Sequence, residues 1–301
     1  MRISDPMITA SLVARLSKAS ERLFRLQEQV ASGLAFNTPS QNPAGAVRAA
    51  TLRSGIAELS RYRQNCDEAT ARLSLTEVAL ASISESLRQA HQAGLAMTLF
   101  DEAGNNALAD QVHQISVSIA DEANFVSEGR YLFGGYETLT PPLVENPAGI
   151  PPYLYQGDRG DISFQLSRAV TVVVNLDAAE MLNLDGAAEP ARDDALETLR
   201  QLEVALRAED QGAVETCLSA LEWHLDHVVA LRGQTGALMQ HVELAKGRLD
   251  EATYTLRELL SDVQDVDITR AVLDLRSQEI TYEAAAAAAS MLHRASLLDY
   301  F

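Results

Sequence analysis

The last fifty residues of the chain carry the most regular hydrophobic pattern in the sequence. Apolar side chains recur there at every seventh position in two parallel series, which only Arg270, Ser277 and Arg294 interrupt. The apolar members of the two series are Leu249, Leu256, Val263, Ala284, Met291 and Leu298, and Ala252, Leu259, Val266, Leu273, Ile280, Ala287 and Phe301. A narrow seam with this spacing is typical of a helix that packs against another helix. We therefore predict one helical repeat that runs unbroken over residues 249–301.

The beginning of the chain carries a matching pattern. Apolar residues again recur at every seventh position, at Leu12, Ala19 and Leu26 and at Leu16, Leu23 and Val30. Residues 1–63 hold nine Lys and Arg against four Asp and Glu, whereas residues 262–301 hold three against seven. Opposite charge adds little affinity between exposed helices, but it favours one partner and one direction. We infer that the two ends pair as a coiled coil, although two ordinary amphipathic helices of one bundle would give the same repeat.

The first half of the chain has a helical pattern almost throughout. Gly33 is expected to end the first helix, and Asn42 can cap the second, with Pro43 at its first position. Glycines within the second helix weaken it but are not expected to end it. Helices are predicted over residues 1–36, 44–100 and 107–127, with turns at 37–43 and 101–106.

The composition changes between Gly129 and Gly186, where repeated glycines and prolines exclude a continuous helix. Apolar residues now alternate with polar ones, at Ile162, Phe164 and Leu166 and then at Val170, Val172, Val174 and Leu176. An alternation with period two predicts two paired strands. Helical spacing resumes over residues 192–207 and breaks at Gly212. It then continues from residue 214 until Gly233 and Gly236, after which the last helix is expected to begin.

This order of elements predicts a mainly α protein. Both termini would form a long antiparallel helical coiled-coil or bundle rod, with a small β-rich inserted domain at the tip. Three domains are expected. Residues 1–42 with 261–301 would form a terminal coiled-coil domain, and residues 43–130 with 186–260 a helical rod domain. Residues 131–185 would form a β-rich outer insert.

Composition and charge exclude several classes of function. Aromatic residues make up only 5% of the 301 residues, which suits helices packed by small side chains. The net charge of −18 argues against a nucleic-acid partner. The most apolar run, residues 284–292, is shorter than the ~20 residues that cross a bilayer, and the first ten residues do not look like a secretory signal. The two cysteines, Cys66 and Cys217, are expected to be small buried hydrophobes.

The sequence offers few candidates for chemistry. His224 and His227 lie three positions apart and could present two nitrogens to a metal, but a zinc site needs a third protein ligand, so we expect a surface pair. Asp158 and Asp161 are explained more simply by a hairpin turn than by acid–base catalysis. We therefore predict no enzyme activity, no cofactor and no metal site.

Four stretches of the sequence resemble the flagellin-like axial proteins of bacterial flagella. The first stretch is residues 1–4, and the second is residues 32–34 with Asn37 and residues 39–45. The third is residues 129–135 with Thr138 and residues 140–142. The fourth extends from residues 265–268 to residues 296–299. The second and fourth stretches resemble flagellin itself, whereas the third resembles the hook-associated proteins of the hook–filament junction. The motif residues that carry the resemblance include Asn42, Pro43, Gly45, Phe133, Gly134, Gly135, Pro141 and Pro142.

The resemblance implies a structural adaptor in an extracellular assembly. In this family the paired termini form the inner tube of the axial structure, the helical rod packs around them, and the insert faces outward. The resemblance also implies export through the flagellar type III system without a cleaved signal peptide. The implied partners are identical subunits in a ring, the preceding hook-associated junction protein, flagellin and a flagellar export chaperone.

The candidate site is therefore an assembly seam on the terminal helices. The residues expected to pack in it, within and between subunits, are Leu12, Leu16, Leu23, Leu26, Val30, Leu256, Leu259, Val263, Val266, Leu273, Ile280, Met291 and Leu298. Three other functions stay open at this point. The chain resembles a short flagellin that builds the filament itself, a secreted coiled-coil protein that acts on membranes would share the terminal helices, and an enzyme is the least supported.

Overall fold

The computed structural model describes residues 5–97, 101–146 and 149–298. The chain forms two compact units, one of residues 1–58 with 251–301, called the terminal unit below, and one of residues 59–250, called the central unit. Helices α2 (Pro43–Ala96) and α6 (Gln211–Gln264) each contribute to both units. The fold is mainly α, with long helices from both ends of the chain and a small strand-containing region, as predicted.

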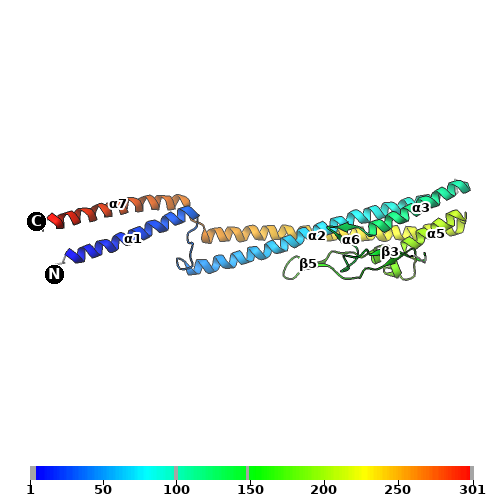
Figure 1. The fold of residues 1–301 in the computed structure, drawn as a ribbon, viewed down its shortest axis with the longest axis horizontal. Helices are drawn as coiled ribbons and strands as arrows, with labels where there is room; N and C mark the ends of the chain where they lie inside the picture. The colour runs from blue at the N-terminus through cyan, green and yellow to red at the C-terminus, as the bar shows by residue number, and fades with distance from the viewer. Residues whose placement is uncertain (1–4, 98–100, 147–148, 299–301) are drawn as a thin grey trace. The chain divides into compact units, whose positions relative to one another are not determined.

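In the terminal unit, α1 (Asp5–Ser32) and α7 (Ile268–Leu298) lie side by side and antiparallel (Figure 1). Gly33 ends α1 as predicted: its φ is 73°, and its N–H donates to the carbonyl of Gln29 at 2.9 Å. Glycine adopts this left-handed conformation without a steric penalty, which is why it commonly follows a helix.

The last helical repeat is interrupted, contrary to the prediction. α6 ends at Gln264, and α7 begins at Ile268 after three residues that are not helical. Asp267 caps α7, because its Oδ1 accepts a hydrogen bond from the N–H of Arg270 at 3.1 Å. The series of apolar residues continues across the interruption, so spacing alone did not reveal it.

The helices of the central unit enclose the main core. α3 (Glu102–Ala123) packs against α5 (Ala195–Arg207), with parts of α2 and α6 beside them (Figure 1). The expected turn over residues 101–106 is wrong, since α3 begins there and Asp101 caps it by accepting from the N–H of Gly104 at 3.0 Å. Large side chains buried completely in this unit include Leu80, Ile83, Leu87, Ile119, Phe133, Leu182, Leu196, Leu199 and Leu202.

Gly233 and Gly236 do not end a helix, and the prediction of a break there is wrong. α6 continues through both residues, and nothing lies within 4 Å of the position that a Cβ would take at either of them. An exposed helical glycine costs only about 1 kcal/mol relative to alanine. The buried residues Leu231 and Thr235, on the same turns of α6, hold the helix against the core.

In the described part of the chain between α3 and α5, six short strands form three two-stranded antiparallel sheets. The pairs are β1 (Val126–Ser127) with β2 (Arg130–Tyr131), β3 (Leu143–Glu145) with β4 (Tyr153–Tyr155), and β5 (Ser163–Gln165) with β6 (Thr171–Val173). The predicted strand pair is confirmed, because Phe164 lies opposite Val172. The short helices α4 (Ala178–Leu182) and η2 (Leu184–Gly186) follow.

The strand-containing region is anchored on the helices of the central unit. Phe133 and Leu143 belong to the same buried cluster as Leu87 and Leu199. A second cluster joins the β5–β6 hairpin to α2 and α6, and its buried members are Cys66, Ala69, Leu73, Leu166, Val174, Val242 and Leu249. The expected insert and the surrounding helices therefore share buried clusters, and the division into three domains stays a prediction.

Candidate assembly surface of the terminal helices

One face of α1 carries the predicted seam residues of the N-terminal helix. Leu12, Leu16, Leu23, Leu26 and Val30 are all half-buried along the helix. Phe24, which lies between two of them in the sequence, points away and is 71% exposed. α7 covers the seam face, and Gln278 Nε2 donates a hydrogen bond to the carbonyl of Ala19 at 3.3 Å.

α7 turns a different face toward α1 from the one that the sequence predicted. Ala271 is buried, and Leu275 and Tyr282 are half-buried, so these residues lie on the covered side. The predicted residues Leu273 and Ile280 are 66% and 67% exposed. Two positions along a helix correspond to a rotation of about 200°, so Leu273 lies almost opposite Ala271. Within one chain, therefore, these two residues form an uncovered apolar row.

Four other predicted seam residues, Leu256, Leu259, Val263 and Val266, lie nearer the junction between α6 and α7. Leu256 packs close to Gly55, where an added Cβ would lie 3.2 Å from Leu256 Cδ1. Val263 and Val266 are half-buried, and Leu259 is more exposed. The side chains of Met291 and Leu298 lie outside those that the structure describes.

Backbone hydrogen bonds join the segment that follows α1 to the segment between α6 and α7. Ala35 N–H donates to the carbonyl of Gln264 at 2.7 Å, and Val266 N–H donates to that of Gly33 at 2.9 Å. The Gln264 side chain is nearly buried, and its Oε1 accepts from Arg53 Nη2 at 2.8 Å. Because a buried amide needs a partner, this contact holds α2 to the end of α6. Sequence spacing offered no signal for it.

The motif after α1 builds the turn into α2. Asn42 Oδ1 accepts a hydrogen bond from the N–H of Gly45 at 2.9 Å, and Pro43 is the first residue of the helix, as predicted. Gly45 leaves room for this cap, since a Cβ there would lie 2.8 Å from Asn42 Cγ and 3.0 Å from the buried ring of Phe36. These motif residues therefore shape the chain.

The motif after β2 holds the strand-containing region to the core. Phe133 is fully buried, and its carbonyl accepts from the N–H of Ala178 at 3.0 Å. Gly135 has a φ of 67°, and a Cβ there would collide with Asp158. Gly134 is also tightly enclosed, because a Cβ would lie 2.5 Å from the carbonyl oxygen of Glu137.

The remaining two motif residues continue this contact, with Pro142 buried and Pro141 half-buried. The carbonyl of Pro142 accepts from the N–H of Gln156 at 2.8 Å. Asp158 was expected in a hairpin turn, but the loop between β4 and β5 contains it, and its carboxylate accepts from the N–H of Tyr136. That expectation is therefore wrong, because Asp158 fixes the turn at Gly135 instead.

His224 is a core residue, so the expected surface pair of histidines is wrong. It is 2% exposed, and burial lowers the pKa of its ring to about 4. His227 instead stacks on Trp223 with 5.1 Å between ring centroids, and its Nε2 lies 2.8 Å from the carbonyl of Glu180.

Metal-binding groups and cysteines are the remaining candidates for chemistry among the described residues. No group of three or more His, Cys, Asp or Glu in this part of the chain is placed to hold a metal ion. Cys66 and Cys217 are free and buried, as expected, and burial raises the pKa of both thiols. Within the same residues, no helix is both long and apolar enough to cross a membrane.

Comparison with known proteins gives two family matches, at the two ends of the chain. Residues 3–138 match the bacterial flagellin N-terminal helical region, and residues 218–301 match the bacterial flagellin C-terminal helical region. Flagellar hook-associated protein 3 of Salmonella typhimurium is 23% identical, and the match covers 94% of each chain.

Solved structures share the fold. A putative flagellar hook-associated protein from Vibrio parahaemolyticus superposes with a TM-score of 0.68 at 20% identity, over 75% of this chain and all of that one. The flagellar junction protein FlgL from Legionella pneumophila superposes with a TM-score of 0.59 at 14% identity, over 74% of this chain and all of that one. With the flagellin N-terminal and C-terminal helical regions matched in order, the chain belongs to the flagellin-like family, and along nearly its whole length it is similar to flagellar hook-associated protein 3.

Proposed function

We propose that the chain is a structural adaptor subunit of the bacterial flagellum, which assembles with identical copies into a ring at the hook–filament junction. The ring would link the preceding hook-associated protein to flagellin. The observation that carries the proposal is the apolar row of Leu273 and Ile280, which α1 leaves uncovered on α7. Uncovered apolar residues at regular helical spacing suit a neighbouring helix, so this row is the proposed contact between subunits.

The proposal assigns a place to each expected domain. Residues 1–42 with 261–301 would form the inner tube, 43–130 with 186–260 the rod around it, and 131–185 the outer insert. The subunit would leave the cell through the flagellar type III system without a cleaved signal, with an export chaperone covering its C-terminal helix. The exposed row on α7 supports a need for such cover, because apolar surface promotes association before assembly.

Substitution in the apolar row tests the proposal. Leu273→Asp should leave the isolated chain folded but prevent its incorporation into flagella, because the contact between subunits would bury an unpaired carboxylate. Leu244→Asp is the matched control, since Leu244 is 60% exposed on α6 in the central unit. The control should incorporate normally. Normal incorporation of the Leu273→Asp chain would refute the seam.

Immunogold labelling separates the remaining alternatives. Antibodies against residues 131–185 should label intact flagella in a single band where the hook meets the filament. Label along the whole filament would identify a short flagellin. Absence of label from flagella would favour the membrane-active protein, for which release of dye from liposomes is the direct assay.

A further inference from the structure

Among the described residues, no other strand pairs with the outer edge of β6. Within them β5 and β6 pair only with each other, and Val174 N–H donates to the carbonyl of Ile162 at 3.0 Å. Hydrogen-bonded pairs alternate with other pairs along an antiparallel ladder. The N–H and carbonyl groups of Thr171 and Val173 therefore point away from β5, toward the outer edge.

The two edges of this hairpin are treated differently. On the β5 side, the carbonyl of Gln165 accepts a hydrogen bond from Asn65 Nδ2 of α2 at 2.7 Å. On the β6 side, the chain borders a hollow of about 450 Å³ instead. Open strand edges attract further strands, which is why proteins usually cover or shorten them.

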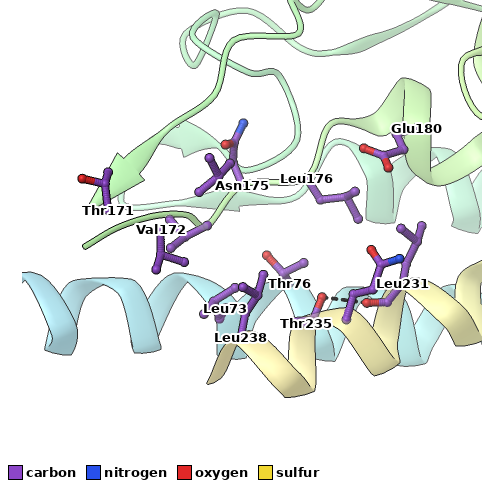
Figure 2. A pocket seen from close by; sticks show the side chains of 13 residues that line it. Leu73, Thr76, Thr171, Val172, Asn175, Leu176, Glu180, Leu231, Thr235 and Leu238 are labelled. Carbon is purple, nitrogen blue, oxygen red and sulfur yellow. Dashed lines mark hydrogen bonds between the residues drawn. The ribbon is translucent and has the colours of Figure 1, made fainter. Parts of the chain in front are cut away.

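The hollow lies within the central unit, between residues 171–176 and the helices α2 and α6 (Figure 2). In Figure 2 the side chain of Val172 points toward these helices, and Leu73 and Leu238 lie on the helical side. The hydroxyl groups of Thr76 and Thr235 already have hydrogen-bond partners, because each donates to a carbonyl of its own helix. Leu73, Leu231 and Leu238 form the apolar part of the helical wall, and Gln234 also lines it.

We propose that this edge binds an extended segment of another polypeptide, which adds to β6 as a third strand. The outward N–H and carbonyl groups of β6 would supply hydrogen bonds, and alternate apolar side chains of the segment would enter the hollow. This mode of recognition reads a backbone and needs pockets only for every second side chain. The inference is independent of the proposed ring.

Charge indicates which segment fits. Among the described residues that line the hollow, Glu180 alone carries a charge, and its side chain is exposed. The chain as a whole has a net charge of −18, which disfavours a second copy of itself beside the Glu180 carboxylate. The segment that suits the site therefore has apolar residues at alternate positions and a Lys or Arg that reaches Glu180.

The test uses the full-length chain and a capped synthetic peptide, acetyl-Val-Thr-Val-Thr-Val-Lys-amide. Saturating peptide should slow hydrogen exchange at the amides of Thr171 and Val173 at least tenfold, measured by NMR. A peptide with the same side chains but N-methylated at alternate amides should give no protection, since it cannot donate along the strand. Equal binding of the two peptides, or binding without protection at these amides, would overturn the proposal.

Variants of the chain sharpen the test. Val173→Pro removes an outward N–H that β5 does not use, and it should weaken binding at least tenfold. Glu180→Gln should weaken binding of the lysine peptide several-fold. It should leave unchanged the binding of a peptide that has glutamine in place of the lysine. If Val173→Pro unfolds the hairpin, the N-methylated peptide still decides the question on the unaltered chain. Protection of Thr171 and Val173 that rises with protein concentration without peptide would make a second copy the occupant, against the proposal.

Discussion

The terminal unit and the central unit contain similar helices, but the central unit buries its apolar side chains far more completely. In the central unit, side chains as large as Phe133 and Leu196 have no exposed surface. In the terminal unit, the buried apolar residues among those described are Phe36, Ala49 and Ala271, two of which are alanines. Burial contributes about 25 cal/mol per Å² of apolar surface, so the central unit has much more stabilisation of its own.

This difference indicates where the proposed assembly would complete the fold. Each residue that becomes ordered costs about 1–2 kcal/mol in backbone entropy. Two long helices with one half-buried seam between them offset that cost poorly. A second layer of helices on the exposed row of α7 would offset it better. The terminal unit is thus the part of the molecule whose packing a neighbour can finish.

The largest expected effect is in the central core. Leu196→Ala should lower the free energy of unfolding by about 2–5 kcal/mol, because it removes a fully buried side chain and leaves a cavity. Leu273→Ala, in the exposed row, should change it by less than about 0.5 kcal/mol. Urea unfolding followed by the fluorescence of Trp223, the one tryptophan, measures both. Equal losses in the two variants would contradict the comparison.

A smaller effect is expected at the motif that anchors the strands to the central core. Gly135→Ala should cost about 3 kcal/mol, because it combines a positive φ with a collision against Asp158. Gly129→Ala is the control, since Gly129 has a φ of 77° but nothing within 4 Å of an added Cβ. It should cost only about 1 kcal/mol. Thermal unfolding of the two variants side by side distinguishes collision from backbone strain.

Two titratable groups in the central unit, the half-buried Asp194 and the buried His224, should give opposite dependences on pH. Burial raises the pKa of Asp194, the cap of α5, to about 6. The folded chain then binds an extra proton between about pH 4 and 6, so this group makes the unfolding free energy fall as pH rises. The pKa of His224 is lowered to about 4, so the unfolded chain binds the extra proton, and the unfolding free energy falls as pH drops from about 6.5.

Removing one group should expose the slope of the other. When the pH is lowered from about 6.5 to 4, the unfolding free energy of the Asp194→Asn chain should fall by about 2 kcal/mol more than that of the unaltered chain. The unfolding free energy of the His224→Gln chain should fall by about 2 kcal/mol less. Urea unfolding at a series of pH values measures the slopes. Parallel slopes in all three chains would show that neither group is titrated differently on folding.

The smallest effect belongs to the terminal unit. Gln264→Ala removes the partner of Arg53 and should cost about 1 kcal/mol locally. Exchange of the Ala35 and Val266 amides, which bridge the junction, should become about fivefold faster. Gln240→Ala, at an exposed position of α6, should leave both rates unchanged. Unchanged rates in the Gln264→Ala chain would mean that the backbone bridge alone holds the junction.

Several features were predictable because they depend on neighbours in the sequence. Gly33 ends a helix through its own backbone freedom, and Asn42 caps the next helix by accepting from the N–H three residues later. In the hairpin around Phe164, apolar and polar residues alternate with period two. The pairing of the two ends was also predictable, because α1 has one clear apolar face. By contrast, Gly233 does not end α6 as its sequence context suggested, since a local cost of about 1 kcal/mol is small beside the burial of the same helix.

The sequence by itself determined the helical character of the chain, the presence of apolar repeats at both ends and the hairpin between residues 162 and 174. Only the tertiary structure decided which side of α7 meets α1, where α6 ends and that His224 is buried. The physical reason is that α7 carries alanines over residues 284–289 and apolar residues on several sides, so its sequence permits more than one contact face. The choice among them depends on the backbone junction at Gln264 and on what α1 covers, and neither is encoded by local spacing.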